Sequence, residues 1–295
     1  MSIGVIGAGK WGSALAFALS EKNEVFITSR TPRDMKNFVS LEDILKLEYL
    51  VIAIPAQQIS SWLEEHFIYN GQKILVAAKG IEAKSGKFLN EIYSEYVPEE
   101  NICFLSGPSF ATEVMQSLPT ALVVNSYNEE LSKEFASFFP SFIKVYTSTD
   151  VVGAEVAGAY KNVIAIAAGV CEGLALGKNA AASLISRGLV EMQRFGLVYG
   201  AKEESFVGLS GAGDLFLTAS STMSRNFRVG LGLAAGKTQE EILKELGEVA
   251  EGIGTAYALY DIAKEKKLYL PIAREVYELL EGKSPHITLR DLLSN

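Results

Sequence analysis

One lysine stands in a predicted helix that is otherwise built of small and apolar residues. Lys161 and its neighbour Asn162 interrupt the apolar run over residues 156–169. A helix that is apolar nearly all round should be buried, and burial lowers the pKa of a lysine toward the range in which a general acid or base works. The alternative is a lysine whose ammonium group reaches solvent past its apolar stem. The run itself leaves both interpretations open, so Lys161 is a candidate for proton transfer.

A glycine pattern at the start of the chain is the second chemical signal. The apolar segment 2–6, predicted as a strand, is followed by Gly7, Gly9 and Gly12 in the spacing G-x-G-x-x-G, and then by residues 13–19, predicted as a helix. In dinucleotide sites the three glycines permit a tight turn, close approach of the pyrophosphate and close helix packing, and the helix N-terminus offers N–H groups to the anion. This order favours nucleotide binding over a merely tight turn.

The residue after the second strand bears on the choice of cofactor. NAD sites commonly have an acidic residue about 20 positions past the glycines. Here the predicted strand over residues 24–29 is followed by Arg30 with no acid beside it. An arginine can stack on adenine or meet a 2′-phosphate, so we expect NADP to be accepted, with NAD as a further cofactor. A surface arginine is the alternative, because Asp34 lies four residues on.

The elements that must position these residues fall into two groups. Apolar, strand-like segments recur through the first half of the chain, at residues 49–54, 73–77, 102–105, 121–124 and 142–146. Near-continuous apolar strands that alternate with helices predict an α/β fold, a doubly wound, mostly parallel sheet of Rossmann type. From about Asp150 the pattern is helical. We therefore predict a dinucleotide-binding domain over residues 1–150 and an all-α domain over residues 151–295.

Local signals predict where three later helices begin. Thr238 with Glu241 forms a capping box, and Thr288 with Asp291 resembles a second one near the end of the chain. Pro271 suits a first-turn position. Residues 236–238, GKT, lack the first glycine of a phosphate-binding P-loop, because Leu231 occupies that position. They are better explained as a glycine turn before a helix.

Further candidate ligand contacts follow predicted strands or glycine turns. Lys79 lies in one of three loops, residues 54–57, 77–80 and 106–111, that follow strands, where ligands of open parallel sheets bind. Asp214 follows a glycine turn and could hold a lysine and tune its pKa, while residues 224–226, SRN, suit a phosphate. The alternatives are ordinary connecting loops, a helix N-cap at Asp214 and a surface charge at Arg225.

Composition excludes several classes of protein. The chain has 295 residues, 48% of them hydrophobic, which suits two cores, and its net charge of −8 argues against nucleic acid or anionic membrane as partner. No apolar run has the length of a membrane span, and the strand at Ser2 leaves no room for a signal peptide, so we expect a cytoplasmic protein. Cys103 and Cys171 lie in apolar runs and are expected to be reduced. His66 and His286 have no second ligand at metal-binding spacing, so we expect no metal.

Together these motifs resemble the NAD(P)-dependent glycerol-3-phosphate dehydrogenases of bacterial type, almost from end to end. The resemblance is carried by residues 7–12 (GAGKWG), 79–82 (KGIE), 107–111 (GPSFA), 155–162 (EVAGAYKN), 211–214 (GAGD) and 224–226 (SRN). It implies interconversion of dihydroxyacetone phosphate and sn-glycerol 3-phosphate, with NAD or NADP as cofactor, for phospholipid synthesis. It also implies a helical second domain like that of 6-phosphogluconate dehydrogenase.

The resemblance assigns roles to individual residues. Lys161 matches the catalytic lysine, which exchanges a proton with the C2 oxygen of the substrate. The positions that match substrate-binding residues, with Arg225 and Asn226 at the phosphate, are Lys79, Gly107, Ser109, Asn162, Asp214, Thr218, Ser224, Arg225 and Asn226. The positions that match cofactor-binding residues, the fingerprint glycines included, are Gly7, Gly9, Lys10, Trp11, Gly12, Arg30, Lys79, Ala111, Arg225, Val249 and Glu251.

One departure and two alternatives remain. Between Arg30 and Tyr49 the chain is shorter than is usual in the family, which leaves the choice between NAD and NADP open. A β-hydroxyacid or ketopantoate-type reductase would share the two domains and the lysine but would leave residues 224–226 without a role. A nucleotide sensor without turnover would leave Lys161 without one. A homodimer is the candidate assembly, although the sequence does not fix the oligomeric state.

Overall fold

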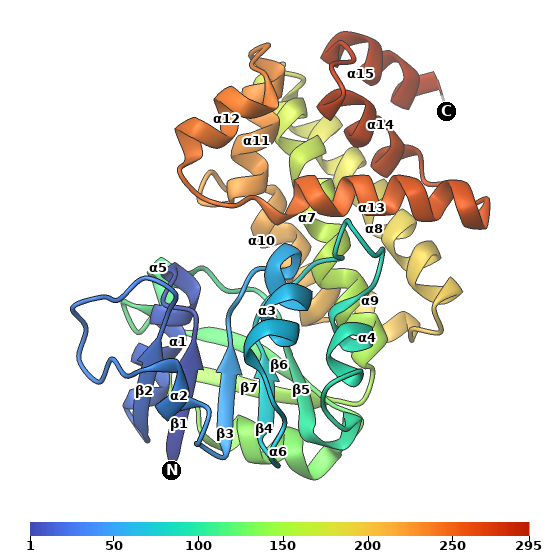
Figure 1. Ribbon diagram of the computed structural model, residues 1–295. Helices are drawn as coiled ribbons and strands as arrows, with labels where there is room; N and C mark the ends of the chain where they lie inside the picture. The colour runs from blue at the N-terminus through green and yellow to red at the C-terminus, as the bar shows by residue number, and fades with distance from the viewer. Residues whose placement is uncertain (295) are drawn as a thin grey trace.

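A seven-stranded sheet and a group of helices lie one above the other in the computed structural model, which describes residues 1–294 (Figure 1). The strand order is β2-β1-β3-β4-β5-β6-β7. β1 to β5 are parallel, β6 runs antiparallel to β5, and β7 is parallel to β6. The strand bounds are β1 Ser2–Ile6, β2 Glu24–Thr28, β3 Tyr49–Ile52, β4 Lys73–Val76, β5 Ile102–Ser106, β6 Thr120–Asn125 and β7 Ile143–Ser148. The mostly parallel sheet is confirmed, and the strand ends differ from the prediction by at most two residues.

Helices cover both faces of this sheet because its strands are apolar on both faces. Along β3, Tyr49 and Val51 join one buried cluster while Leu50 and Ile52 join another. Leu15 of α1 contributes to the first cluster, which also includes residues of α5 and α6. The second cluster includes residues of α2, α3 and α4. The helices are α1 Lys10–Ser20, α2 Leu41–Ile44, α3 Ile59–His66, α4 Leu89–Ser94, α5 Ala111–Val114 and α6 Glu129–Ser137, with short 3₁₀ turns η1 Ala56–Gln58 and η2 Glu99–Asn101. The doubly wound fold is confirmed.

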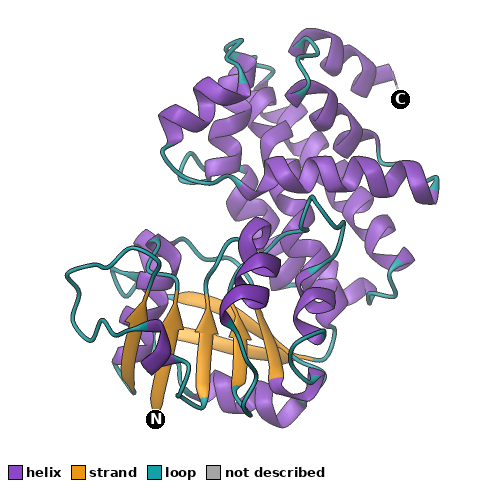
Figure 2. Ribbon diagram, in the orientation of Figure 1, coloured by secondary structure: helices purple, strands orange, loops and turns teal. Residues whose placement is uncertain are grey.

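The rest of the described chain is helical (Figure 2). We call residues 1–148 the sheet half and residues 151–294 the helical half. The bounds in the helical half are α7 Val151–Gly173, α8 Gly177–Val198, α9 Glu203–Val207, η3 Leu209–Gly213, α10 Asp214–Ala219, α11 Arg225–Ala234, α12 Gln239–Leu246, α13 Glu251–Lys266, α14 Pro271–Leu280 and α15 Pro285–Ser294. η3 is a single π-helical turn, a local geometry that often occurs at functional sites.

Helix α7 is the centre of the helical half. It is long and apolar enough to cross a membrane, but 94% of its most apolar 18-residue stretch is buried inside the protein, so it is a core helix. Its glycines allow close helix contacts. A Cβ atom at Gly169 would lie 2.0 Å from the carbonyl oxygen of Phe227 on α11, and a Cβ at Gly230 of α11 would lie 2.0 Å from that of Ile166. The two helices therefore pack backbone to backbone.

Two of the three predicted helix starts are confirmed. Thr238 and Glu241 form the capping box of α12, and Pro271 is the first residue of α14. The start predicted at Thr288 is wrong, because α15 begins at Pro285 and the N–H of Thr288 already donates to the carbonyl of Ser284 at 3.0 Å. The first N–H groups of a helix have no acceptor within the helix, so a proline, which lacks an N–H group, is well tolerated there. Pro285 therefore fixes the start of α15.

Candidate active site

The glycine pattern after β1 builds an open helix start. Gly7 has a φ of +109°, and a Cβ atom there would lie 2.7 Å from the carbonyl oxygen of Ala53. A Cβ at Gly12 would lie 1.8 Å from the carbonyl oxygen of Gly7, so α1 starts directly against the turn. A Cβ at Gly9 would meet no atom within 4 Å, and no side chain caps α1 at this residue. Free N–H groups and open space together fit the pyrophosphate of a dinucleotide.

Two further predicted cofactor residues, Lys10 at this helix start and Arg225 at the start of α11, share one carboxylate. Lys10 Nζ forms an ion pair with Glu248 Oε1 at 2.5 Å, and Arg225 Nη1 lies 3.6 Å from Oε2 of the same carboxylate. Glu248 thus joins two predicted cofactor residues from α1 and α11. Val249, the next residue, is exposed.

The remaining predicted cofactor residues have separate surroundings. Trp11 Nε1 donates to the carbonyl of Ala77 at 3.0 Å, and Glu251 Oε1 accepts from Ala56 N–H at 3.3 Å. Ala111 is the first residue of α5. Arg30 is exposed just past β2, and within residues 1–294 it forms no ion pair.

Two lysines meet at one buried aspartate. Lys161 Nζ on α7 donates to Asp214 Oδ1 at 2.5 Å and to Thr218 Oγ1 at 3.0 Å. Lys79 Nζ, from the loop after β4, donates to Asp214 Oδ2 at 2.7 Å and to the carbonyl of Gly107 at 3.2 Å. Asp214 is the first residue of α10 and Thr218 lies one turn later. The cluster carries one net positive charge, which suits an anionic ligand.

Burial sets the electrostatics of this cluster. Lys161 is 8% exposed, so its ammonium group is buried rather than directed to solvent. The pKa of Lys161 is lowered to about 8, because burial and, to a smaller extent, the charge of Lys79 outweigh the opposing effect of Asp214. Burial would raise the pKa of Asp214, but the two lysines overcome this and hold it below its usual value. The arrangement pairs a permanent carboxylate with a lysine that can exchange a proton near neutral pH.

The predicted phosphate-binding residues lie at the start of α11. Ser224 is the N-cap of this helix and accepts from Phe227 N–H at 3.2 Å, and Arg225 is the first residue, with 43% of its side chain exposed. Asn226 donates to Asn162 Oδ1 at 2.9 Å and accepts from Gly252 N–H at 3.0 Å. These two amides join α7, α11 and α13 at the site.

Ser109 also lies at the site, on the sheet side. Its Oγ donates to the carbonyl of Gly107 at 3.3 Å, and Gly107 has a φ of +101°. The predicted substrate residues therefore come from both halves of the molecule, around the cluster of Lys79, Lys161 and Asp214.

The sequence does not indicate several contacts of this region, although Ser106 lies in the predicted ligand-facing loop 106–111. Ser106 Oγ, at the end of β5, lies 2.7 Å from Ser210 Oγ in the π turn that precedes Asp214, and Asn125 donates to Ser106 at 2.8 Å. Glu248 was also missed. The glycine-rich run at residues 208–213 is a local signal for an unusual turn, but no local pattern indicates the long-range partners of Ser106 or Glu248.

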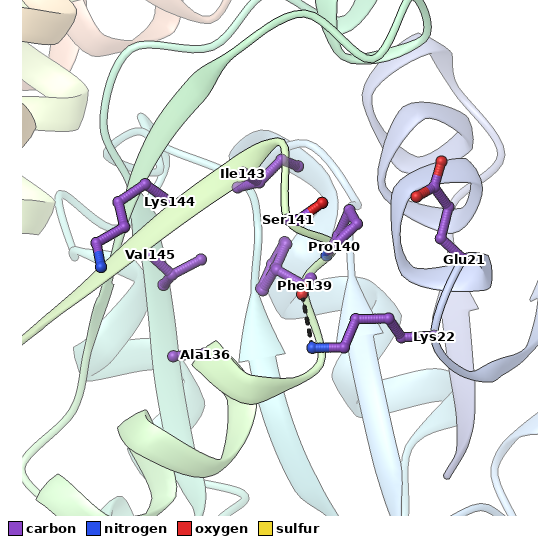
Figure 3. Close-up of a pocket in the computed structure, with 9 residues that line it drawn as sticks. All are labelled: Glu21, Lys22, Ala136, Phe139, Pro140, Ser141, Ile143, Lys144 and Val145. Atoms are coloured by element: carbon purple, nitrogen blue, oxygen red, sulfur yellow. Dashed lines mark hydrogen bonds between the residues drawn. The ribbon is translucent and has the colours of Figure 1, made fainter.

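A surface hollow lies elsewhere in the sheet half (Figure 3). It measures about 480 Å³ and is lined by residues near the α1–β2 turn and the start of β7. Lys22 donates to the carbonyl groups of Ser137 at 2.6 Å and Phe139 at 3.0 Å, so its ammonium group joins two segments of the fold. None of the predicted site residues lines this hollow.

Comparison with known proteins identifies relatives over the whole chain. A family profile for the NAD-dependent glycerol-3-phosphate dehydrogenase N-terminus matches residues 28–132, and one for the C-terminus matches residues 150–290. A glycerol-3-phosphate dehydrogenase [NAD(P)+] of Sulfurimonas denitrificans is 84% identical over 99% of both chains, and one of Nitratiruptor sp. is 61% identical over 99% of this chain and 98% of its own length. The crystal structure of a glycerol-3-phosphate dehydrogenase from Coxiella burnetii has a TM-score of 0.91 at 31% identity, with 100% of this chain and 99% of that chain covered.

Proposed function

The chain belongs to the NAD-dependent glycerol-3-phosphate dehydrogenase family, and we propose that its buried Lys161 transfers the proton in the reaction of that family. The protein is an oxidoreductase that interconverts dihydroxyacetone phosphate and sn-glycerol 3-phosphate with a nicotinamide dinucleotide. The observation that supports the role of Lys161 is its buried ammonium group, held by Asp214 and Thr218. A reductase for unphosphorylated carboxylates and a sensor without turnover are set aside by the family membership.

The glycine turn after β1 and the open start of α1 fit the cofactor. The open space at Gly9 and the free N–H groups of the helix start are suited to the pyrophosphate, with Lys10 and Arg225 as nearby cations. When it is bound, the nicotinamide dinucleotide supplies or accepts the hydride.

The proton is handled by Lys161. Its ammonium group has three donors, of which Asp214 and Thr218 take two, so the third is free for the C2 oxygen of the substrate. In the direction of reduction Lys161 gives its proton to that oxygen, and in the direction of oxidation the neutral amine takes the proton back. Asp214 holds the lysine in place and favours the ammonium form, which a purely buried lysine would lose.

Substrate binding is assigned to residues of both halves. Lys79 is directed at the polar groups of the substrate, beside Gly107 and Ser109 on the sheet side. Arg225 is assigned to the phosphate, together with Ser224 and Asn226, because a guanidinium group matches phosphate oxygens in charge and geometry. Asn162 and Thr218 complete the pocket on the side of Lys161.

We also assign the wider setting of the enzyme. Residues 1–150 form the dinucleotide-binding domain and residues 151–295 the substrate domain, a division supported by the start of α7 at Val151. The enzyme supplies glycerol 3-phosphate for phospholipid synthesis in the cytoplasm.

A homodimer is supported by exposed apolar side chains at Val190, Leu197 and Val198, which lie along one face of α8. Its mass in solution, measured by sedimentation, tests this assembly.

The function is tested by following oxidation of NADPH or NADH with dihydroxyacetone phosphate as substrate. We expect turnover with the phosphorylated ketone, and a much higher KM with unphosphorylated dihydroxyacetone. Arg225→Ala should reduce this preference by about tenfold or more, because a charge-assisted hydrogen bond contributes roughly 1.5–3 kcal/mol. Equal use of both ketones by the unmodified enzyme would contradict the assigned substrate.

The cofactor preference is assigned to the surroundings of Arg30. With an arginine and no carboxylate after β2, the 2′-phosphate of NADPH meets no repulsion there. Arg30→Asp should therefore shift the ratio of kcat/KM values toward NADH. An unchanged ratio would show that the ribose is recognised elsewhere, in the shortened segment before Tyr49.

A further inference from the structure

A glutamate that the proposed reaction does not use is buried where the two halves meet. Glu155 lies on α7, and 5% of its surface is exposed. Its Oε2 accepts a hydrogen bond from Asn90 N–H at 3.2 Å, and its carboxyl group also accepts one from Leu89 N–H. Both N–H groups belong to the first turn of α4 in the sheet half. A side chain of the helical half thus caps a helix of the sheet half.

Helix α4 has no equivalent acceptor of its own. Phe88 stands before its first residue and has no acceptor atom in its side chain. Glu91 accepts from Phe88 N–H at 2.7 Å, which leaves the next two N–H groups to Glu155. Buried N–H groups without acceptors destabilise the start of a helix, so α4 depends on Glu155 for its position.

The loop that carries Lys79 ends where helix α4 begins. This loop, residues 77–88, is held in its middle by Gln57, which donates to the carbonyl of Ile81 at 2.7 Å and accepts from Ala83 N–H at 2.8 Å. At its end, Phe88 is buried in the core of the helical half, with its ring 5.2 Å from that of Tyr199. Glu155 fixes the next two residues, so the loop is anchored on α7 at the point where it becomes a helix.

Lys79 itself rests on the same part of α7. A Cβ atom at Gly158, one turn after Glu155, would lie 3.2–3.3 Å from the Cβ, Cγ and Cδ atoms of Lys79. The stem of Lys79 therefore packs on the backbone of α7, and its ammonium group continues to Asp214 and the carbonyl of Gly107. A shift of the loop along α7 would move this ammonium group away from both partners.

We propose that Glu155 is a positioning residue for substrate binding: by capping α4 from the opposite half, it holds loop 77–88 on α7 and keeps Lys79 beside Asp214. The proposal rests on the proposed function, in which Lys79 contacts the substrate. Burial raises the pKa of Glu155 to about 8, so near neutral pH the carboxyl group is mostly protonated and accepts through its remaining lone pairs. Glu155→Gln therefore keeps an acceptor of the same shape, whereas Glu155→Ala removes it.

Steady-state kinetics with dihydroxyacetone phosphate and NADPH test this role. Glu155→Ala should raise the KM for dihydroxyacetone phosphate by roughly three- to tenfold, with a smaller change in kcat and a smaller rise in the KM for NADPH, because Lys79 also matches a cofactor-binding position. Glu155→Gln should restore most of the lost affinity. The matched control is Glu191→Ala, because Glu191 is equally buried and accepts from Ile272 and Ala273 N–H at the start of α14, both at 2.9 Å. This control should lose stability but keep its KM.

A double-mutant cycle separates positioning from general damage. In a Lys79→Ala background, Glu155→Ala should raise the KM little further, because the group that it positions is gone. If Glu155→Ala does not fold, Glu155→Leu fills the same space without an acceptor and should give the same increase in KM. A KM that stays unchanged in folded Glu155→Ala or Glu155→Leu enzyme, or one that rises equally in Glu191→Ala, would overturn the proposal. Absence of turnover in the unmodified enzyme would instead reject the proposed function.

Discussion

Lys161 combines two environments that pull its pKa in opposite directions. Burial in α7 disfavours the ammonium form, while the carboxylate of Asp214 at 2.5 Å favours it. The balance leaves the pKa at about 8, far below the usual value of a lysine. Such a group holds a proton firmly enough to donate it and loosely enough to exchange it at physiological pH. The neighbouring Lys79 adds positive charge without being needed for the proton itself.

Replacement of Lys161 tests its role as proton carrier. Lys161→Ala should lower kcat by about 10²-fold or more, because general acid–base catalysis commonly contributes that much. Cofactor affinity, measured by the fluorescence of bound NADPH, should be retained. Lys178→Ala is the control, since Lys178 is an exposed lysine of the same half, paired with Glu172. Near-normal turnover in Lys161→Ala would assign the proton to another group.

The pH dependence of oxidation tests the state of the same residue. In the proposed reaction, oxidation of glycerol 3-phosphate uses the neutral amine of Lys161, so kcat should rise about tenfold per pH unit below the pKa of Lys161 and level off above about 8. Asp214→Asn removes the charge that favours the ammonium form, so the rise should move to lower pH. Asp261→Asn, on the exposed surface of α13, should leave the profile in place. A shift to higher pH in Asp214→Asn would contradict this account.

At the scale of elements, the connection between α12 and α13 supplies one carboxylate that pairs with two cations. Glu248 lies in this connection and pairs with Lys10 of α1 and Arg225 of α11. Both cations are assigned to the cofactor, so an anionic cofactor competes with this carboxylate for them. With these assignments, we expect the ion pairs of Glu248 to be lost when the cofactor binds.

Removing this competition should strengthen cofactor binding. Glu248→Gln should lower the Kd for NADPH by about two- to fivefold at low salt, in line with the modest strength of partly exposed ion pairs. The gain should shrink as salt is added, because mobile ions screen the same charges. Glu245→Gln is the matched control, since Glu245 lies on α12 and pairs with Lys237 instead. A higher Kd in Glu248→Gln would mean that the carboxylate assists binding rather than opposing it.

The elements were more predictable from the sequence than the contacts between them. Strands and most helix starts depend on neighbouring residues, such as Thr238 with Glu241, so a local pattern identifies them. Thr288 was misassigned because Pro285 starts α15 earlier. The sequence also singled out Lys79, Lys161, Asp214 and Thr218, and the fold brings these four together.

Other contacts of the site carry no local signal. Lys10 and Glu248 are 238 residues apart in sequence, and the partners of Glu155 are 65 and 66 positions away. Such pairs depend on how α1, α4 and the helical half are packed, and a glutamate in an apolar run does not indicate its partner. Glu155 was visible in the family motif over residues 155–162, but its contact with α4 follows from the three-dimensional fold alone.

At the scale of the whole molecule, buried polar groups join the two halves. Glu155 caps α4, Glu251 accepts from Ala56 N–H at 3.3 Å, and Lys79 reaches Asp214. Each of these contacts exists in the folded protein and is lost on unfolding. Their protonation is therefore coupled to the free energy of unfolding of the whole chain.

Glu155 should make this free energy depend on pH in a definite direction. Its pKa is raised from 4.5 to about 8 by burial, while the N–H groups of Asn90 and Leu89 and the charge of Lys79 lower it and Glu91 raises it. Between these two values the folded protein binds the proton that the unfolded chain has released, so the contribution of Glu155 to stability falls as pH rises from about 4.5 to about 8.

Glu155→Gln removes this titrating proton. Denaturant unfolding at a series of pH values should therefore show the variant gaining stability relative to the unmodified protein across that range, by up to about 1.4 kcal/mol per pH unit. Glu64→Gln, an exposed residue of α3, should show no such trend. A constant difference between Glu155→Gln and the unmodified protein would mean that the buried carboxyl group is ionised throughout, with its charge stabilised by the start of α4.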